Sequence, residues 1–135
     1  LYNEKNIIIT SGGGGIPVVV EDGQYISIPA VIDKDMAGAK LATLVDADLF
    51  LILTAVNRVY TNFGKPSQKE VKKMSSNEAK LYIKEGQFAP GSMLPKIKAA
   101  IEFVDQKIDS QVIIGSLEEA SLAIKGNAGT IIYKE

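Results

Sequence analysis

Two lysines and the aspartates beside one of them are the strongest candidates for chemistry in this sequence. Lys34 stands between Asp33 and Asp35 at the start of an expected helix, and Lys96 falls in the first turn of another. A lysine in a first turn opposes the helix macrodipole, so a bound anion would explain its position. Lys34 could in turn neutralise a phosphoryl group while Asp35 orients the lysines around it.

Each of these residues also has a purely structural interpretation. Asp33 can cap its helix with solvated neighbours, and for an arbitrary Asp-Lys-Asp this interpretation is the favoured one. Lys96 can point into water at small cost. The local patterns leave both alternatives open.

A run of glycines is a second candidate site, since it follows an expected strand at 7–10. Glycines allow backbone N–H groups to turn toward an anion without side chains intervening. The spacing is neither that of a dinucleotide-binding fold nor that of a P-loop, and a flexible turn is an equally good interpretation. The candidate phosphate-loop residues are Gly12, Gly13, Gly14 and Gly15.

The segment after the apolar run 48–53 is a candidate nucleotide site. In a parallel sheet, ligands bind beyond the carboxyl ends of the strands, where Thr54 and Val56 fall. Tyr60 could flank an adenine, although a loop aromatic more often packs against its own domain. Met93 is likewise better explained by the core or its rim than by a specific base contact.

Composition excludes several classes of function. The chain has 135 residues, 46% of them hydrophobic and 23% charged, which is the balance of a folded domain. The net charge of −1 is spread along the chain, so we expect no nucleic-acid partner. Without Cys or His there is no thiolate, imidazole base or Cys/His metal site. No apolar run is long enough to cross a membrane, and a cytoplasmic setting is expected.

Strand signals occur along the whole chain. Asp22-Gly23 between two apolar runs predicts a hairpin. Residues 57–74 are expected to form an exposed loop with one short strand near Tyr60. Short apolar runs predict further strands at 7–10, 48–53, 112–115 and 130–133.

Helical spacing separates these strands. Ser75 and Glu78 form a capping-box pattern, and Ser92 is expected to cap the longest helix. Helices are predicted over 35–45, 75–85, 92–108 and 117–125. The alternation predicts an α/β fold, a three-layer α/β/α sandwich with a mainly parallel sheet.

Five motifs in order closely resemble carbamate kinases, which are members of the amino-acid kinase family. The motifs are S-G-G-G-G-I-P at 11–17, V-I-D-K-D at 31–35, L-T-A-V-N at 53–57, N-F-G-K-P at 62–66 and F-A-P-G-S-M-L-P-K at 88–96. The resemblance covers essentially the whole chain and agrees with the expected sandwich. It implies reversible phosphoryl transfer between ATP and carbamate, with ADP and carbamoyl phosphate as the other pair, in arginine metabolism.

The resemblance also implies roles for individual residues. Lys34 and Lys96 would hold the transferring phosphoryl group and the ATP phosphates, with Asp35 positioning both lysines. The glycines at 12–15 would lie beside the acceptor. Mg²⁺ would be carried by the nucleotide, with no metal site in the chain. The positions around the adenosine would be Thr54, Val56, Tyr60, Gly91, Ser92 and Met93.

Two departures from the family pattern limit what the resemblance implies. Ala55 replaces the aspartate of the T-D-V found in many amino-acid kinases, which removes an acidic nucleotide contact. The N-terminal part of the family chain is absent, so residues 1–135 would be a C-terminal ATP-binding part. It would be inactive alone, and the full-length enzyme would form a homodimer. The alternatives are another amino-acid kinase and a non-catalytic nucleotide-binding fragment.

Overall fold

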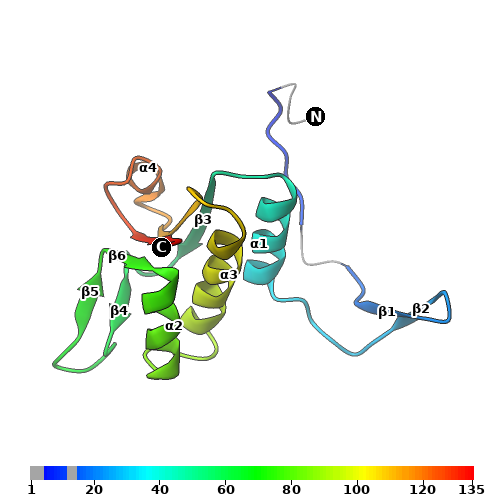
Figure 1. Ribbon diagram of the computed structural model, residues 1–135, viewed down its shortest axis with the longest axis horizontal. Coiled ribbons are helices and arrows are strands. Elements are labelled where there is room, and N and C mark those ends of the chain that lie inside the picture. The colour runs from blue at the N-terminus through cyan, green and yellow to red at the C-terminus, as the bar shows by residue number, and fades with distance from the viewer. Residues whose placement is uncertain (1–4, 12–14) are drawn as a thin grey trace.

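A four-stranded mixed sheet forms the centre of the computed structural model, which describes residues 5–11 and 15–135 (Figure 1). Its strand order is β3-β7-β8-β6. β3 pairs in parallel with β7 and β6 in parallel with β8, whereas β7 and β8 are antiparallel. The predicted α/β sandwich is confirmed, although one of the three pairings is not parallel. The strands are β3 (Leu49–Thr54), β6 (Lys73–Ser75), β7 (Gln111–Ser116) and β8 (Thr130–Tyr133).

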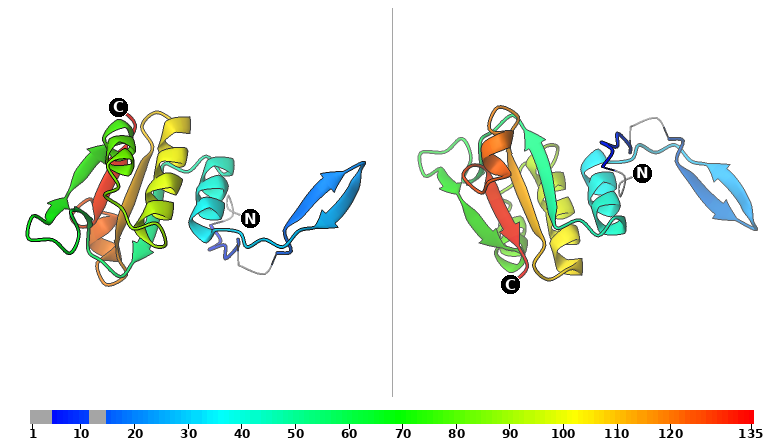
Figure 2. Two further views of the ribbon diagram at one scale, coloured as in Figure 1. Left: turned by 90° about the horizontal axis from the view of Figure 1, so that it is seen from below. Right: turned by 90° about the horizontal axis from the view of Figure 1, so that it is seen from above.

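Three helices cover one face of the sheet and one short helix covers the other (Figure 2). α3 (Met93–Gln106) lies across the sheet between α1 (Lys34–Leu44) and α2 (Ser76–Lys84). α4 (Ala120–Ala123) packs on the opposite face. α1 and α3 run in the same direction, so their N-terminal ends lie at the same end of the molecule (Figure 1).

The main core lies between α3 and the sheet. Ile97 and Val104 of α3 are fully buried, and Phe103 meets the Phe50 ring edge-on at 5.8 Å between centroids. A Cβ at Gly38 would stand 3.1 Å from the Phe50 ring, so this glycine allows α1 to lie close to β3. Burial of this apolar surface is the main source of stability, and it fixes α1 and α3 relative to one another.

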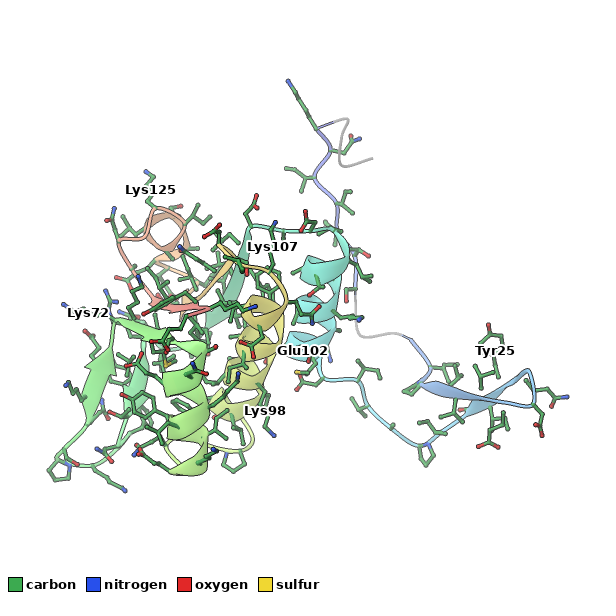
Figure 3. All side chains as sticks on the ribbon, viewed as in Figure 1. Tyr25, Lys72, Lys98, Glu102, Lys107 and Lys125 are labelled. Atoms are coloured by element: carbon green, nitrogen blue, oxygen red, sulfur yellow. The ribbon has the colours of Figure 1, made fainter. Side chains whose placement is uncertain are left out.

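Two hairpins extend beyond the sheet. β1 (Val18–Glu21) and β2 (Gln24–Ser27) turn at Asp22-Gly23, as predicted, and project away from the other elements, with Tyr25 79% exposed (Figure 3). β4 (Val59–Thr61) and β5 (Lys69–Val71) form the second hairpin. Residues 57–74 thus contain three short strands instead of the one predicted, because three-residue strands are too short to give a periodic signal.

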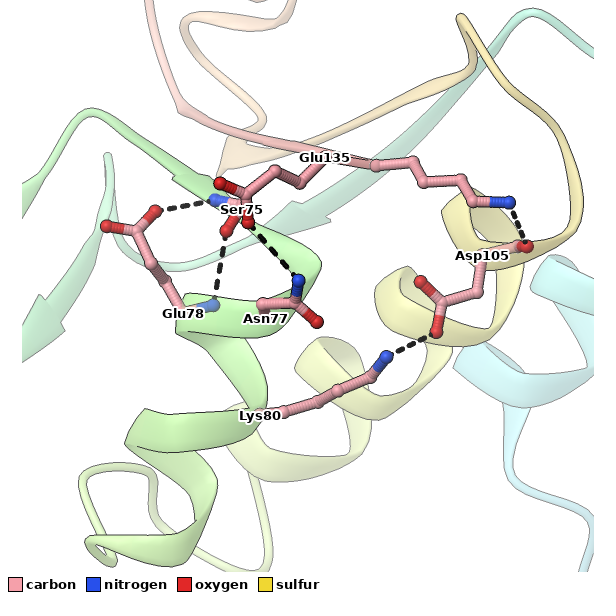
Figure 4. Close-up of polar contacts among 7 residues, drawn as sticks. Ser75, Asn77, Glu78, Lys80, Asp105 and Glu135 are labelled. Atoms are coloured by element: carbon pink, nitrogen blue, oxygen red, sulfur yellow. Dashed lines mark hydrogen bonds and ion pairs between the residues drawn. The ribbon is translucent and has the colours of Figure 1, made fainter.

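The local helix-start predictions are confirmed at two helices. Ser75 accepts a hydrogen bond from Glu78 N, and the Glu78 carboxylate accepts one from Ser75 N (Figure 4). Asp33 Oδ1 accepts from Met36 N at 3.0 Å and caps α1.

No helix among the described residues is long and apolar enough to cross a membrane.

The cap predicted at Ser92 is wrong, although Ser92 does occupy the position before α3. Its side chain makes no capping hydrogen bond. Pro95 stands at the third helical position and has no N–H to donate. Leu94 N instead donates to Ala89 O at 3.0 Å, so a backbone turn replaces the side-chain cap.

Two further elements differ from the prediction. Residues 7–10 form no strand, and Ile7 and Ile9 are almost fully exposed, because among the described residues no strand pairs with them. The expected helix over 117–125 is reduced to α4. Leu117 and Ile124 are more than half exposed, so the apolar surface that would hold a longer helix in place is missing.

Candidate functional site

Asp35 and Lys96 meet at the N-terminal ends of α1 and α3. Lys96 Nζ donates a hydrogen bond to Asp35 Oδ2 at 2.8 Å, and the two side chains are only 20% and 23% exposed. Residues 61 positions apart in the sequence are thus joined by the packing of α1 on α3. The predicted association of Asp35 with Lys96 is present in the structure.

Lys34 lies at the same place. It is exposed, and it lines a shallow, open hollow together with Asp35 and Lys96. Two helix N-termini and two lysines therefore face one region, and both features attract anions. The residues that line this lysine hollow are Val31, Ile32, Asp33, Lys34, Asp35 and Lys96.

A second hollow shares Lys34 with the first and reaches the glycine-rich segment. Gly15 and Ser11 line it opposite Ala37 of α1. The predicted loop glycine Gly15 thus lines the same hollow as Lys34. The other loop glycines, Gly12, Gly13 and Gly14, lie outside the described residues.

An apolar cavity of about 220 Å³ opens beyond the carboxyl end of β3. Five of the predicted adenosine residues line it, namely Thr54, Val56, Tyr60, Ser92 and Met93. Gly91 is exposed next to Ser92 and does not line the cavity. Ala55 does line it, so the departure from the family's aspartate falls at the cavity wall.

Sequence reasoning missed four cavity residues, Phe63, Gln87, Phe88 and Ala89. The Phe63 ring lies 6.0 Å from the Tyr60 ring, so the two form an aromatic wall. Phe63 stands in the N-F-G-K-P motif and Phe88 and Ala89 begin the F-A-P-G-S-M motif, so the resemblance could have identified them. Gln87 lies outside all five motifs.

The first turn of α3 joins the cavity to the lysine hollow. Ser92 and Met93 line the cavity, and Lys96, three positions after Met93, lines the lysine hollow. Three residues of α-helix rise by about 4.5 Å. A ligand with a flat apolar group and an anionic tail could therefore occupy both sites across this turn.

Within the described residues, no group of three or more acidic side chains is placed to hold a metal ion.

A protein-family model described as the amino acid kinase family matches residues 1–115. This chain belongs to the amino acid kinase family. The matched region contains both lysines and the whole lining of the cavity. The apolar cavity and the lysine hollow therefore both lie within the region that the family model matches.

Similar proteins with a curated name include several carbamate kinases. Carbamate kinase 2 of Staphylococcus aureus (strain bovine RF122 / ET3-1) is 49% identical over 133 residues, which are 98% of this chain and 42% of that protein. Carbamate kinase of Clostridium perfringens (strain 13 / Type A) is 53% identical over 128 residues, which are 95% and 41% of the two chains. The chain thus spans about two-fifths of the length of these relatives.

A solved structure shows the same fold. The carbamate kinase from Giardia lamblia bound to AMP-PNP superposes with a TM-score of 0.84 at 39% identity, over 90% of this chain and 42% of that one.

Proposed function

We propose that residues 1–135 are the C-terminal, nucleotide-binding part of a carbamate kinase, which transfers a phosphoryl group between ATP and carbamate. The observation that carries this proposal is the first turn of α3, which borders both an apolar cavity and a hollow containing two lysines. The carbamate kinase relatives and the AMP-PNP bound to the Giardia enzyme support it.

The nucleotide would bind across this turn of α3. Its adenine would enter the apolar cavity against Tyr60 and Phe63, and its phosphates would extend toward Lys96 and Lys34. A cavity that is mostly apolar, with few polar groups, is typical of sites for flat rings. Ammonium groups at two helix N-termini are typical of sites for phosphates.

In the direction of carbamate phosphorylation, an oxygen of carbamate would attack the γ-phosphorus of ATP in line with its bond to the β,γ-bridging oxygen, and that bond would break to release ADP. Carbamate is already an anion, so no side chain has to remove a proton from it. Lys34 and Lys96 would neutralise charge on the transferring group, and Asp35 would hold Lys96 in place through its 2.8 Å bond. Gly15 and its neighbours would lie beside the acceptor.

Further parts of the proposal concern the complete enzyme. Mg²⁺ would be carried by the nucleotide, carbamate or carbamoyl phosphate would be the second substrate, and the enzyme would be a cytoplasmic homodimer. Its expected role is to make ATP from ADP and carbamoyl phosphate during arginine breakdown.

Two experiments test the proposal at two levels. Isothermal titration calorimetry on residues 1–135 with Mg·ADP tests nucleotide binding, and saturable one-to-one binding is expected. In the complete protein, ATP formation from ADP is expected with carbamoyl phosphate and not with acetylglutamyl phosphate. Activity with the second donor alone would assign another amino-acid kinase. Binding without turnover in the complete protein would leave a non-catalytic nucleotide-binding module.

A further inference from the structure

Two segments from distant parts of the sequence form opposite walls of the apolar cavity. The β4–β5 hairpin supplies the aromatic wall, Tyr60 and Phe63. The connection between α2 and α3, together with the first residue of α3, supplies the other wall, which includes Phe88 and Met93. The width of the cavity therefore depends on what holds the hairpin against this connection.

The base of the hairpin is attached firmly to the sheet. Val59 N donates to Thr130 Oγ1 at 2.8 Å, and the Thr130 hydroxyl donates to Val71 O. Thr130 belongs to β8 and is fully buried, so one side chain joins the start of β4 to the end of β5. Arg58 adds a hydrogen bond to Gly129 O.

The tip of the hairpin, residues 62–68, is attached differently. Asn62 N donates to Gln87 Oε1 at 2.8 Å. The other hydrogen bonds of the tip close on the tip itself, among them Gly64 N to Gln68 Oε1 at 2.8 Å and Lys65 N to Asn62 O at 3.0 Å. Within the part of the chain that the structure describes, Gln87 is the hydrogen-bond partner that the tip has outside its own hairpin.

Gln87 is itself fixed in position. Its N–H, three residues beyond the end of α2, donates to Tyr82 O at 3.0 Å. The next residue, Phe88, is 5% exposed and packs edge-on against the Tyr82 ring. The half-buried side chain of Gln87 thus extends from a rigid support to the opposite wall.

We propose that Gln87 is a positioning residue that fastens the aromatic wall to the α2–α3 connection and so sets the width of the cavity for a flat ring. This inference rests on the proposed nucleotide binding and extends it to a residue outside the shared motifs. Gln87 borders the cavity itself and holds Asn62 in the hairpin that carries the aromatic wall, and it does not line the lysine hollow. Its loss should therefore weaken binding of the base and leave the contacts to the phosphates unchanged.

Three variants of residues 1–135 test this role. Gln87→Met keeps the length of the side chain and removes the acceptor, while Gln87→Glu keeps an acceptor for Asn62 N. The matched control is Gln68→Met, which removes a bond of equal length that lies within the tip. Calorimetry with Mg·ADP and with adenosine measures affinity, and hydrogen exchange of peptides containing Asn62 measures attachment of the tip.

For Gln87→Met we expect the affinities for ADP and adenosine to fall together, by roughly three- to ten-fold, as for the loss of one ordinary hydrogen bond. Exchange at Asn62 should accelerate while exchange in β7 is unchanged. Gln87→Glu should retain the nucleotide affinity and the slow exchange at Asn62 of the unmodified chain. Gln68→Met should keep its affinity for ADP and adenosine within about twofold of the unmodified chain.

The possible failures can be told apart. If the unmodified chain binds neither ADP nor adenosine, the proposed function fails. If it binds both and Gln87→Met binds them equally well, the role of Gln87 is refuted. Equal losses in Gln87→Met and Gln68→Met would also refute it, since order within the tip would then matter and the bond between the walls would not.

Discussion

The two ends of α3 both carry a lysine paired with aspartate, but the two lysines differ in their effect on the stability of the helix. At the N-terminal end, Lys96 binds Asp35 of α1. Lys107 lies just beyond the C-terminal end (Figure 3). It binds Asp46 at 3.1 Å and Asp48 at 2.9 Å, and it also donates to Asp46 O. The residue types are the same, but the helix macrodipole favours a cation only at the second end.

This difference separates a structural ion pair from a candidate functional one. Hydrogen bonds to Asp48 and Asp46 raise the pKa of Lys107, and its contacts close the turn between α1 and β3. Helix stability accounts for that lysine. At Lys96 the macrodipole is unfavourable and the helix needs no cation, which is consistent with the anionic ligand proposed for this end.

The largest expected effect comes from replacing Lys96, the lysine at the N-terminal end of α3. In the complete protein, Lys96→Met should lower turnover of ADP and carbamoyl phosphate by about 10²–10³-fold, because one preorganised charge at the transferring group is lost. Steady-state kinetics measure this change, and thermal unfolding should show little loss of stability. A variant with nearly normal turnover would exclude Lys96 from the reaction.

The matched change at the other end should have the opposite outcome. Lys107→Met should leave turnover within about twofold, because Lys107 lines neither the apolar cavity nor the lysine hollow. It should lower the melting temperature. Because the pKa of Lys107 is raised in the folded state, its stabilisation is complete below the unfolded pKa and is lost as pH rises through the folded one. The difference in melting temperature should therefore persist at neutral pH and shrink only in strong alkali. A large loss of activity would remove the contrast between the two ends.

The smallest effect is expected at a third pair, which joins α2 to α3. Lys80 Nζ lies 2.7 Å from Asp105 Oδ2, and both side chains are more than a third exposed (Figure 4). Burial opposes ionisation of Asp105, but hydrogen bonds from Lys80 and Ser76 outweigh it and lower the pKa of this carboxyl. Asp105→Asn should cost less than about 1 kcal/mol at neutral pH, since exposed pairs are screened by solvent.

The pH dependence of that small effect has a defined sign. A lowered carboxyl pKa stabilises the fold above the unfolded value and ceases to do so as pH falls through the folded value. Urea unfolding of the two proteins should therefore give different stabilities at neutral pH and converging ones well below the ordinary aspartate pKa of 3.8. A difference that grows in acid would contradict the pairing.

Sequence reasoning succeeded where the determining contacts are local. The capping box at Ser75 and Glu78 and the turn at Asp22-Gly23 depend on neighbours within a few residues, and both are present. The cap at Ser92 failed because Pro95, three positions later, has no N–H to donate. The same short motif thus contains both the serine that suggests a cap and the proline that prevents it.

Non-local contacts account for what sequence could not provide. The strand expected at 7–10 would need a partner strand beside it, and the described structure contains none for it. Gln87 meets Asn62 across 25 positions, and no spacing rule relates those two residues. Only the resemblance to carbamate kinases pointed to both lysines at one site, which the packing of α1 on α3 then produces.

The antiparallel strand β8 determines where a label can be attached without interference. Tyr133 of β8 lies opposite Gln111, at the start of β7, whereas Thr54 and Ser116 end their strands at the opposite edge. A biotin or fluorophore joined after Glu135 would therefore leave from the edge of the sheet remote from the cavity. A sensor surface that captures the chain through this tether would leave the cavity accessible to nucleotide in solution.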